Sequence, residues 1–193
     1  MAYRQKKHQM TEREWQKYKL KLAVMISDID IKRYLGDDDD LIIRYCQLQN
    51  YNTIDEIIPY DGSFKFVLTE GKMNSGHWCV LIRHNGVVEW FNPLGTRPDS
   101  ELSFIPRSIK ICLGEDNHYL SYLLKKTSWL KVIWNKMKLQ RVATGINTCG
   151  RHCISRVIFM KMGYNLKQYQ EMVLSEIEET GKPSDVLVVD WIK

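Results

Sequence analysis

A cysteine at the start of a predicted helix is the residue in this sequence best placed for nucleophilic chemistry. Cys149 follows a polar, turn-prone run and precedes an apolar run with helical spacing, and Gly150 after it would allow another backbone or a substrate to approach closely. The first turn of a helix presents unpaired backbone N–H groups and the positive end of the helix dipole. Both favour the reactive thiolate over the thiol. Taken alone, Cys149 fits a buried helical cysteine better, so its chemistry depends on a nearby base.

Upstream residues supply the groups that such a cysteine needs, namely a base, a residue that orients the base, and an oxyanion donor. His77, after a flexible loop that ends at Gly76, begins a predicted strand and is the candidate base. Asn92 ends the strand predicted to pair with it, so the two side chains can meet, and its oxygen can fix the imidazole tautomer. Gln140 can offer an amide N–H to an oxyanion beside the backbone N–H of Cys149. This ordered set indicates thiol catalysis far more specifically than any member alone.

Neighbouring residues compete for two of these roles. Asn147 is an amide closer to the nucleophile and could face the oxyanion in place of Gln140. Glu89 is the fallback acid for orienting the base, although strand alternation turns it away from the face of Asn92. His152 lies one turn after the nucleophile and shares its helix face only loosely, so we do not expect it to be the base.

The motifs resemble the adenovirus-protease (adenain) and Ulp/SENP-like clan of cysteine endopeptidases. The matching stretches, all between residues 64 and 162, are Gly76-His77-Trp78, Trp90-Phe91-Asn92-Pro93-Leu94-Gly95, Gln140 and Thr148-Cys149-Gly150. The chain's size and its Phe-Asn-Pro-Leu-Gly segment look most like the viral branch, which includes adenovirus and the virophage or Polinton-like elements. Two features depart from the family pattern. The clan usually has Asp or Glu where Asn92 stands, and Gln140 lies farther ahead of the cysteine than usual.

The resemblance implies an endopeptidase with a Cys-His-Asn triad that cleaves viral precursor (capsid) proteins after small residues such as glycine during virion maturation. Trp78, Gly76 and Gly150 would then bind substrate, with Trp78 walling a channel too narrow for side chains. The reaction needs no metal or organic cofactor. The same fold in the Ulp branch removes ubiquitin-like modifiers, and related bacterial effectors use a similar residue set to acetylate proteins. A non-enzymatic basic binding module, with Cys149 merely buried, is the remaining alternative.

Composition is that of an ordinary globular protein. The chain has 193 residues, 44% of them hydrophobic and 26% charged, which suits a single domain with a substantial core. We expect no membrane span, because no run of 18 apolar residues exists, and no secretory signal, because the basic start lacks an apolar segment behind it. Five cysteines without a C-x-x-C pair fit neither a disulfide framework nor a zinc site. Free thiols indicate a reducing compartment, which for a viral protease means the virion and the infected-cell interior.

The net charge of +5 is concentrated in residues 4–8, 17–21 and 125–141. Such a surplus commonly accompanies contact with nucleic acid, and by resemblance nucleic acid would act as an activator; a solvated basic surface explains it at least as well. The remaining expected partners are the protein substrates, and we expect a monomer. The run Asp37–Asp40 is interpreted as a solvated turn or helix cap rather than a metal site.

Predicted helices lie at both ends of the chain and predicted strands in the middle, which indicates one α+β domain. By resemblance the fold is papain-like or Ulp-like, with a central mixed or antiparallel sheet flanked by helices and the nucleophile at a helix N-terminus. We divide residues 1–193 into a helical N-terminal part (1–60), a catalytic core (64–162) and C-terminal helices (164–193). The main predicted elements are helices from residue 11 and over 28–35, 115–126 and 164–180, strands over 64–68, 77–82, 87–91 and 130–139, and a loop over 69–76.

Overall fold

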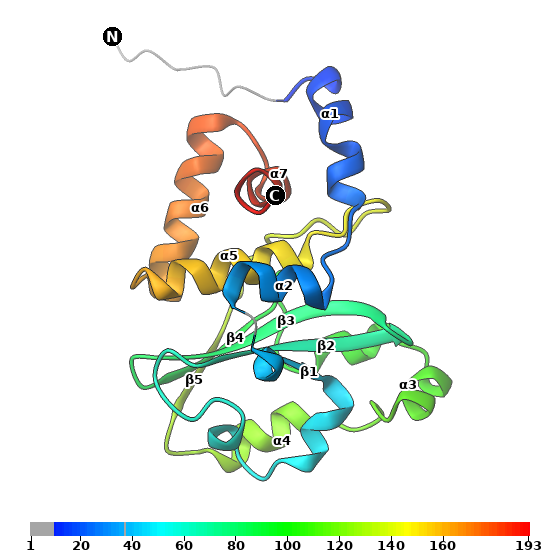
Figure 1. Ribbon diagram of the computed structural model, residues 1–193, viewed down its shortest axis with the longest axis vertical. Helices are drawn as coiled ribbons and strands as arrows, with labels where there is room; N and C mark the ends of the chain where they lie inside the picture. The colour runs from blue at the N-terminus through cyan, green and yellow to red at the C-terminus, as the bar shows by residue number, and fades with distance from the viewer. Residues whose placement is uncertain (1–9, 37) are drawn as a thin grey trace.

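The computed structural model describes residues 10–36 and 38–193 and contains a five-stranded mixed sheet between two sets of helices (Figure 1). The strands follow chain order across the sheet: β1 (Ile42–Arg44), β2 (Phe64–Lys72), β3 (Ser75–His84), β4 (Val87–Phe91) and β5 (Lys131–Trp134). Strands β2, β3 and β4 form an antiparallel meander, and β1 and β5 each pair in parallel with their neighbour. The predicted α+β class with a mixed sheet is confirmed.

The helices are divided between the two faces of the sheet and the end of the molecule above it (Figure 1). They are α1 (Glu12–Ala23), α2 (Asp28–Leu35), α3 (Arg107–Leu113), α4 (Tyr119–Lys126), α5 (Cys149–Lys161), α6 (Leu166–Thr180) and α7 (Ser184–Trp191), with short 3-10 helices η1 (Asp39–Leu41), η2 (Tyr45–Asn50), η3 (Ile54–Glu56) and η4 (Ser100–Phe104). Capping boxes start α1 at Thr11 and α2 at Ser27, where the side chain and backbone of the cap residue pair with an acid three residues on.

Both faces of the sheet are covered, which is why residues 66–68 of β2 and 78–82 of β3 are continuously apolar. One face, carrying Phe66, Trp78 and Val80, packs against α5 together with α2 and α6. The other face, carrying Val67, Cys79 and Leu81, packs against α4 and the 3-10 helices. A smaller apolar cluster joins α1 to α7 through Leu22, Val186 and Val189. The two faces matter for the site because a strand residue belongs to one or the other by alternation.

The predicted loop over residues 69–76 is wrong, because most of this segment continues the strands. β2 extends to Lys72 and β3 begins at Ser75, so a tight turn remains at Met73 and Asn74, where Asn74 has a φ of 58°. The buried Glu70 carboxylate accepts the backbone N–H of Asn74 at 2.5 Å and pairs with Arg44 at 3.2 Å. These hydrogen bonds, one local and one from Arg44 of β1, stabilise a polar hairpin that hydrophobic alternation does not reveal. His77 is therefore the third residue of β3 rather than the first.

Other predicted boundaries also shift. The strand predicted over 130–139 ends at Trp134, because the buried Asn135 side chain donates to the carbonyls of Asn92 and Met137 and turns the chain away. The helix predicted over 115–126 begins only at Tyr119, since the Glu115 carboxylate lies buried against the backbone N–H of Glu70. Helix α3 and η4 were not predicted, and the N-terminal part (1–60) contributes strand β1 as well as helices.

The acidic run agrees with its interpretation as a cap where it is described. Asp38 is the N-cap of η1, and its side chain accepts the backbone N–H of Asp40. Asp37 and the basic run over residues 4–8 lie outside the described residues. All five cysteines are free thiols. Within the described chain, every helix is too short or too polar to cross a lipid bilayer.

Candidate active site

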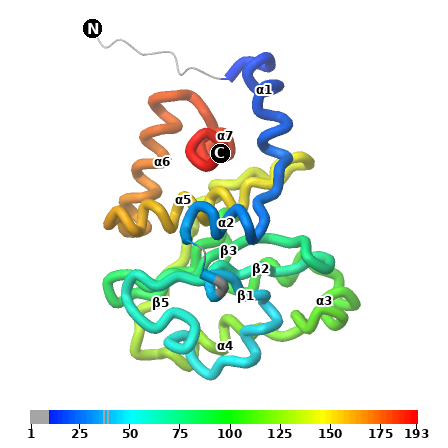
Figure 2. Tube along the Cα trace, viewed as in Figure 1, coloured from blue at the N-terminus to red at the C-terminus, as the bar shows by residue number. Residues whose placement is uncertain are grey.

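Cys149 is the first residue of α5 and is 8% exposed. The segment that leads to it is held by helix α7, whose buried Asp185 accepts the Thr148 hydroxyl at 2.5 Å and the backbone N–H of Arg141 at 3.0 Å. The backbone N–H of Asn147 donates to the carbonyl of Leu22 at the end of α1. Figure 2 shows this stretch passing from β5 past the end of α1 to the start of α5. The nucleophile candidate is thus fixed at a helix N-terminus by contacts with both chain ends.

His77 lies between Asn92 and Cys149. Its Nε2 is 2.8 Å from Asn92 Oδ1, and its ring forms a further hydrogen bond with the Cys149 side chain. Asn92 Oδ1 also accepts the backbone N–H of Leu94 at 2.9 Å, while Asn92 Nδ2 donates to Thr96 Oγ1 at 2.7 Å. These partners define which end of the amide faces His77. Nε2 therefore carries a proton that it donates to Asn92, and Nδ1 faces the thiol.

The pKa values of Cys149 and His77 are shifted toward an ion pair. Burial raises the pKa of the Cys149 thiol, but the hydrogen bond and charge of His77, with backbone N–H groups at Trp78 and Gly150, outweigh it and lower the pKa overall. Burial likewise lowers the pKa of His77, but the hydrogen bonds with Cys149 and Asn92 outweigh it and raise the pKa overall. Thiolate and imidazolium stabilise each other, as a thiol nucleophile requires.

This ion pair predicts the pH dependence of alkylation by iodoacetamide. Below a pKa of about 8.5, an ordinary thiol loses thiolate tenfold per pH unit, whereas the lowered pKa of Cys149 leaves a larger fraction of this residue as thiolate. The ratio of labelling at Cys149 to labelling at the exposed Cys112 is therefore expected to rise as the pH falls from about 8.5 to about 6. Peptide mass spectrometry measures the ratio. His77→Ala should remove the rise, and a flat ratio in the unaltered protein would contradict the ion pair.

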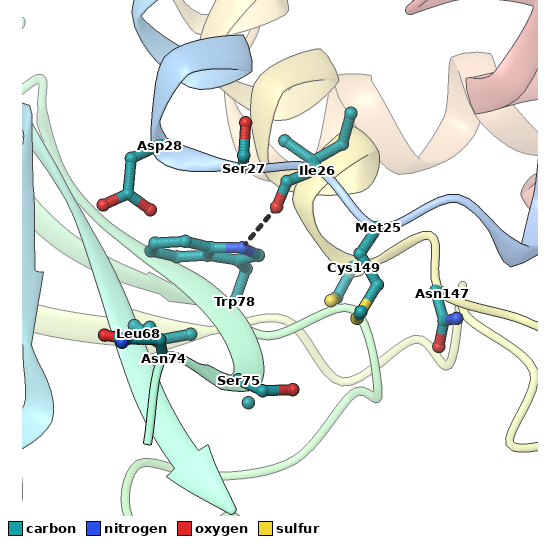
Figure 3. A pocket seen from close by; sticks show the side chains of 11 residues that line it. Met25, Ile26, Ser27, Asp28, Leu68, Asn74, Ser75, Trp78, Asn147 and Cys149 are labelled. Carbon is teal, nitrogen blue, oxygen red and sulfur yellow. Dashed lines mark hydrogen bonds between the residues drawn. The ribbon is translucent and has the colours of Figure 1, made fainter. Parts of the chain in front are cut away.

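A cleft of about 230 Å³ opens beside Cys149. It lies between the segment that joins α1 to α2 and the tip of the β2–β3 hairpin, and its lining includes Met25, Asp28, Gly76, Trp78 and Asn147. The Trp78 ring forms one wall, and its Nε1 donates to the Ile26 carbonyl at 3.0 Å (Figure 3). Trp78 is 5% exposed and also packs in the core. The geometry places Cys149 at one end of a groove that has an indole wall.

The two glycines predicted to bind substrate are in different situations. Gly76 lines the cleft, and a Cβ there would meet the Thr69 carbonyl oxygen at 1.9 Å, so the absent side chain allows close approach of the hairpin strands. Gly150 is buried, and a Cβ there would meet Ile26 Cβ at 2.7 Å. The close approach expected at Gly150 is therefore that of Ile26 in the same chain. The substrate-binding role of Gly150 stays a prediction.

Both amides considered for the oxyanion belong to the loop ahead of α5 and already donate to a backbone carbonyl. Gln140 Nε2 donates to the Ile146 carbonyl at 3.4 Å, and its buried Oε1 has no hydrogen-bond partner among the described residues. Asn147 lines the cleft, but its Nδ2 donates to the Ala23 carbonyl at 2.8 Å. Each NH₂ retains a second hydrogen. Backbone N–H groups of the first α5 turn remain the donors that the fold itself directs at Cys149.

Two further candidates lie away from His77. Glu89 faces α5 and forms a bidentate ion pair with Arg156, at 2.8 Å for each hydrogen bond, so it is not the residue that orients His77. His152 is buried with its Nε2 3.3 Å from Asp185, which assigns it to the network that holds the start of α5. The described residues contain no group of three or more His, Cys, Asp or Glu side chains suited to a metal ion.

Two buried acids near the site were not predicted from the sequence. Asp185 holds the approach to Cys149, and Glu101 in η4 contacts Asn92. Neither has a local motif that distinguishes it from a surface acid. Their only sequence signal is an acid among apolar neighbours, as in the run from Asp185 to Val189.

No family model matches the chain. The chain is 35% identical to "Uncharacterized protein V9" of Sputnik virophage over 160 residues, which cover 81% of this chain and 89% of the virophage protein. The chain belongs to the V9 family. A virophage relative fits the viral origin that the motifs imply. The name of V9 states no activity, so the chemistry of the V9 family has to be argued from the site.

Proposed function

We propose that this V9-family protein is a cysteine endopeptidase with Cys149 as nucleophile, His77 as base and Asn92 as the residue that orients the base. The observation that carries the proposal is the position of His77, which is hydrogen-bonded on one side to Asn92 and on the other to a cysteine with a lowered pKa at a helix N-terminus. A buried structural cysteine has no need of such a partner. The buried Cys153, one turn later, instead has a raised pKa because of burial.

The reaction follows from this arrangement. The Cys149 thiolate adds to the peptide carbonyl, and the resulting oxyanion receives hydrogen bonds from the Cys149 backbone N–H and from Gln140 or Asn147. The His77 imidazolium gives its Nδ1 proton to the leaving amine, which leaves a thioester between Cys149 and the substrate. Neutral His77 then takes a proton from water, and the hydroxide so formed hydrolyses the thioester. Asn92 keeps Nε2 protonated and Nδ1 directed at the sulfur throughout.

We further propose that the substrates are viral precursor proteins cleaved after a small residue such as glycine. Support comes from the virophage relative and from the walls of the cleft, where Trp78 and Met25 stand beside Cys149 (Figure 3). The backbone of Gly76 also lines this groove. A substrate residue without a side chain can bring its carbonyl carbon to the sulfur between such walls with the least clash.

A covalent trap tests the proposal. The purified protein is incubated with a peptide vinyl sulfone ending in Gly-Gly, and intact mass and peptide mapping locate the adduct. We expect one equivalent on Cys149, formed faster than labelling of the other four cysteines, and blocked by His77→Ala. Candidate capsid precursors of the same virus, a ubiquitin-like modifier fusion and acetyl-CoA are then offered separately. Equal, slow labelling of all five cysteines would contradict the enzyme, and transfer of acetyl alone would indicate the effector-type activity.

A further inference from the structure

A buried carboxylate stands directly behind Asn92. Glu101 lies in η4, is 4% exposed, and its Oε2 is 3.3 Å from Asn92 Nδ2. Its other oxygen, Oε1, is buried with no hydrogen-bond partner in the described part of the chain. Strand alternation puts His77 and Asn92 on the face of the sheet opposite α5, the face on which η4 also packs through Leu102. The three side chains therefore form a line from the imidazole to a buried acid.

We propose that Glu101 is a positioning residue of the candidate active site, which acts through Asn92 to supply the negative charge that stabilises the His77 imidazolium. The role in catalysis rests on the proposed function, whereas the effect on His77 does not. The Glu101 carboxylate is separated from the histidine by one side chain, that of Asn92.

Four hydrogen bonds fix the orientation of the Asn92 amide. Its Oδ1 accepts from His77 and from the backbone N–H of Leu94, and its two Nδ2 hydrogens go to Thr96 and Glu101. All of the strong hydrogen-bonding positions of the amide are thus used. A flipped amide would direct Nδ2 at the protonated Nε2 of His77 and its oxygen at the Glu101 carboxylate, which are two repulsive contacts. Together with the Leu94 N–H, Glu101 therefore favours the orientation in which Asn92 accepts from His77.

The charges of Glu101 and His77 favour each other. Burial raises the pKa of Glu101 to about 7, and the charge of His77 is among the influences that lower it. The groups around Glu101 from the neighbouring elements are His77 and Cys79 of β3, Tyr45 of η2, and Asp99 just before η4. Of these only His77 carries positive charge, because Asp99 is an acid that accepts from the Tyr45 hydroxyl and from the Ser121 backbone N–H. Because the site is buried, the charge of the Glu101 carboxylate acts on His77 over a longer range than it would in water.

The test compares Glu101→Gln with the unaltered protein, because glutamine keeps the shape and removes the charge. The titration of the His77 ring is followed by NMR, which needs no substrate. We expect the midpoint of His77 to fall by about 0.5–1 pH unit, at or just below the lower limit for an opposite charge in direct contact, because Asn92 stands between the two groups. Where peptide cleavage is measured, kcat should fall about tenfold with little change in KM. The alkaline limb of the pH profile should shift to lower pH by about the same 0.5–1 unit as the His77 midpoint.

Two further variants make the test specific. Glu115→Gln is the matched control, since Glu115 is also buried with its pKa raised to about 7 but contacts the Glu70 backbone instead of Asn92. It should leave the His77 midpoint in place. Combining Asn92→Asp with Glu101→Gln returns one negative charge to the site, so the midpoint should recover.

An unchanged His77 midpoint in Glu101→Gln, with thermal unfolding showing a folded protein, would overturn the inference. Loss of the proposed function would instead appear as absent trapping of Cys149 in the unaltered protein.

Discussion

Cys149→Ala is expected to reduce kcat/KM for peptide cleavage by at least about 10⁴-fold, because Cys149 is the thiol that His77 contacts in the described part of the chain and no acyl-enzyme forms without it. His77→Ala should cost about as much, since the thiolate depends on its hydrogen bond and charge. The two losses should not add in the double variant, because the residues act as a unit. Initial rates on a precursor fragment, with active-site titration, measure the effect.

Cys153→Ala is the matched control for this prediction. Cys153 lies one turn along the same helix, is fully buried, and donates its thiol to the Trp78 carbonyl at 3.4 Å. Its loss should lower stability by about 1 kcal/mol, the usual cost of a small change in a core, and leave kcat/KM within about threefold. Equal activity of Cys149→Ala and the unaltered protein would refute the assignment of the nucleophile. Equal loss in both cysteine variants would point to a general disturbance of α5.

Arg156→Met is expected to produce the largest loss of stability, about 3–5 kcal/mol, because it leaves the Glu89 carboxylate buried without a partner. Arg156 is fully buried, donates twice to Glu89 at 2.8 Å, and also donates to the Tyr164 carbonyl at 3.1 Å. Its guanidinium stands 5.5 Å from the centre of the Tyr169 ring. Urea unfolding followed by tryptophan fluorescence measures the loss.

Two comparisons separate burial from charge in this experiment. Lys167→Met breaks the exposed pair of Lys167 with Glu171 at 3.6 Å and should change the free energy of unfolding by less than about 0.5 kcal/mol. Combining Glu89→Gln with Arg156→Met should recover part of the loss, since no charge then stays buried. A loss below about 1 kcal/mol for Arg156→Met would show that water reaches Glu89 in the folded protein.

Local signals predicted the parts of the fold that depend on few residues. The helices predicted from residue 11 and over 28–35 are confirmed, and Thr11 and Ser27 cap them. Asn85-Gly86, a pair typical of hairpin turns, forms the turn between β3 and β4, where both residues have positive φ. Cys149 opens its helix as expected from the change from polar to apolar residues. Alternation along β4 separated Glu89 from Asn92, and the structure places Glu89 against Arg156.

What escaped prediction depends on contacts between distant segments. The hairpin from Thr69 to Gly76 looks like a loop because Glu70 is polar, and only Arg44 and Glu115, from other parts of the chain, explain its burial. The acid behind Asn92 belongs to η4, a short 3-10 helix with no helical periodicity to reveal it. Sequence distance from Cys149 does not decide whether Gln140 or Asn147 faces the oxyanion. The reason is that residues 135–148 follow an irregular path set by tertiary hydrogen bonds.

The partners of the nucleophile come from strands far away in the chain, and this separation bears on when the chemistry can begin. Contacts between distant segments form only after the entropy of closing a long loop has been overcome, so they belong to the late, cooperative stage of folding. Until α5 packs on β3, Cys149 is an ordinary thiol on an unstructured segment, and His77 has neither Asn92 nor the sulfur beside it. A nascent or partly folded chain would therefore be inert, and reactivity would switch on together with native packing. For the proposed protease activity, native packing of α5 on the sheet is then a precondition of the first cleavage.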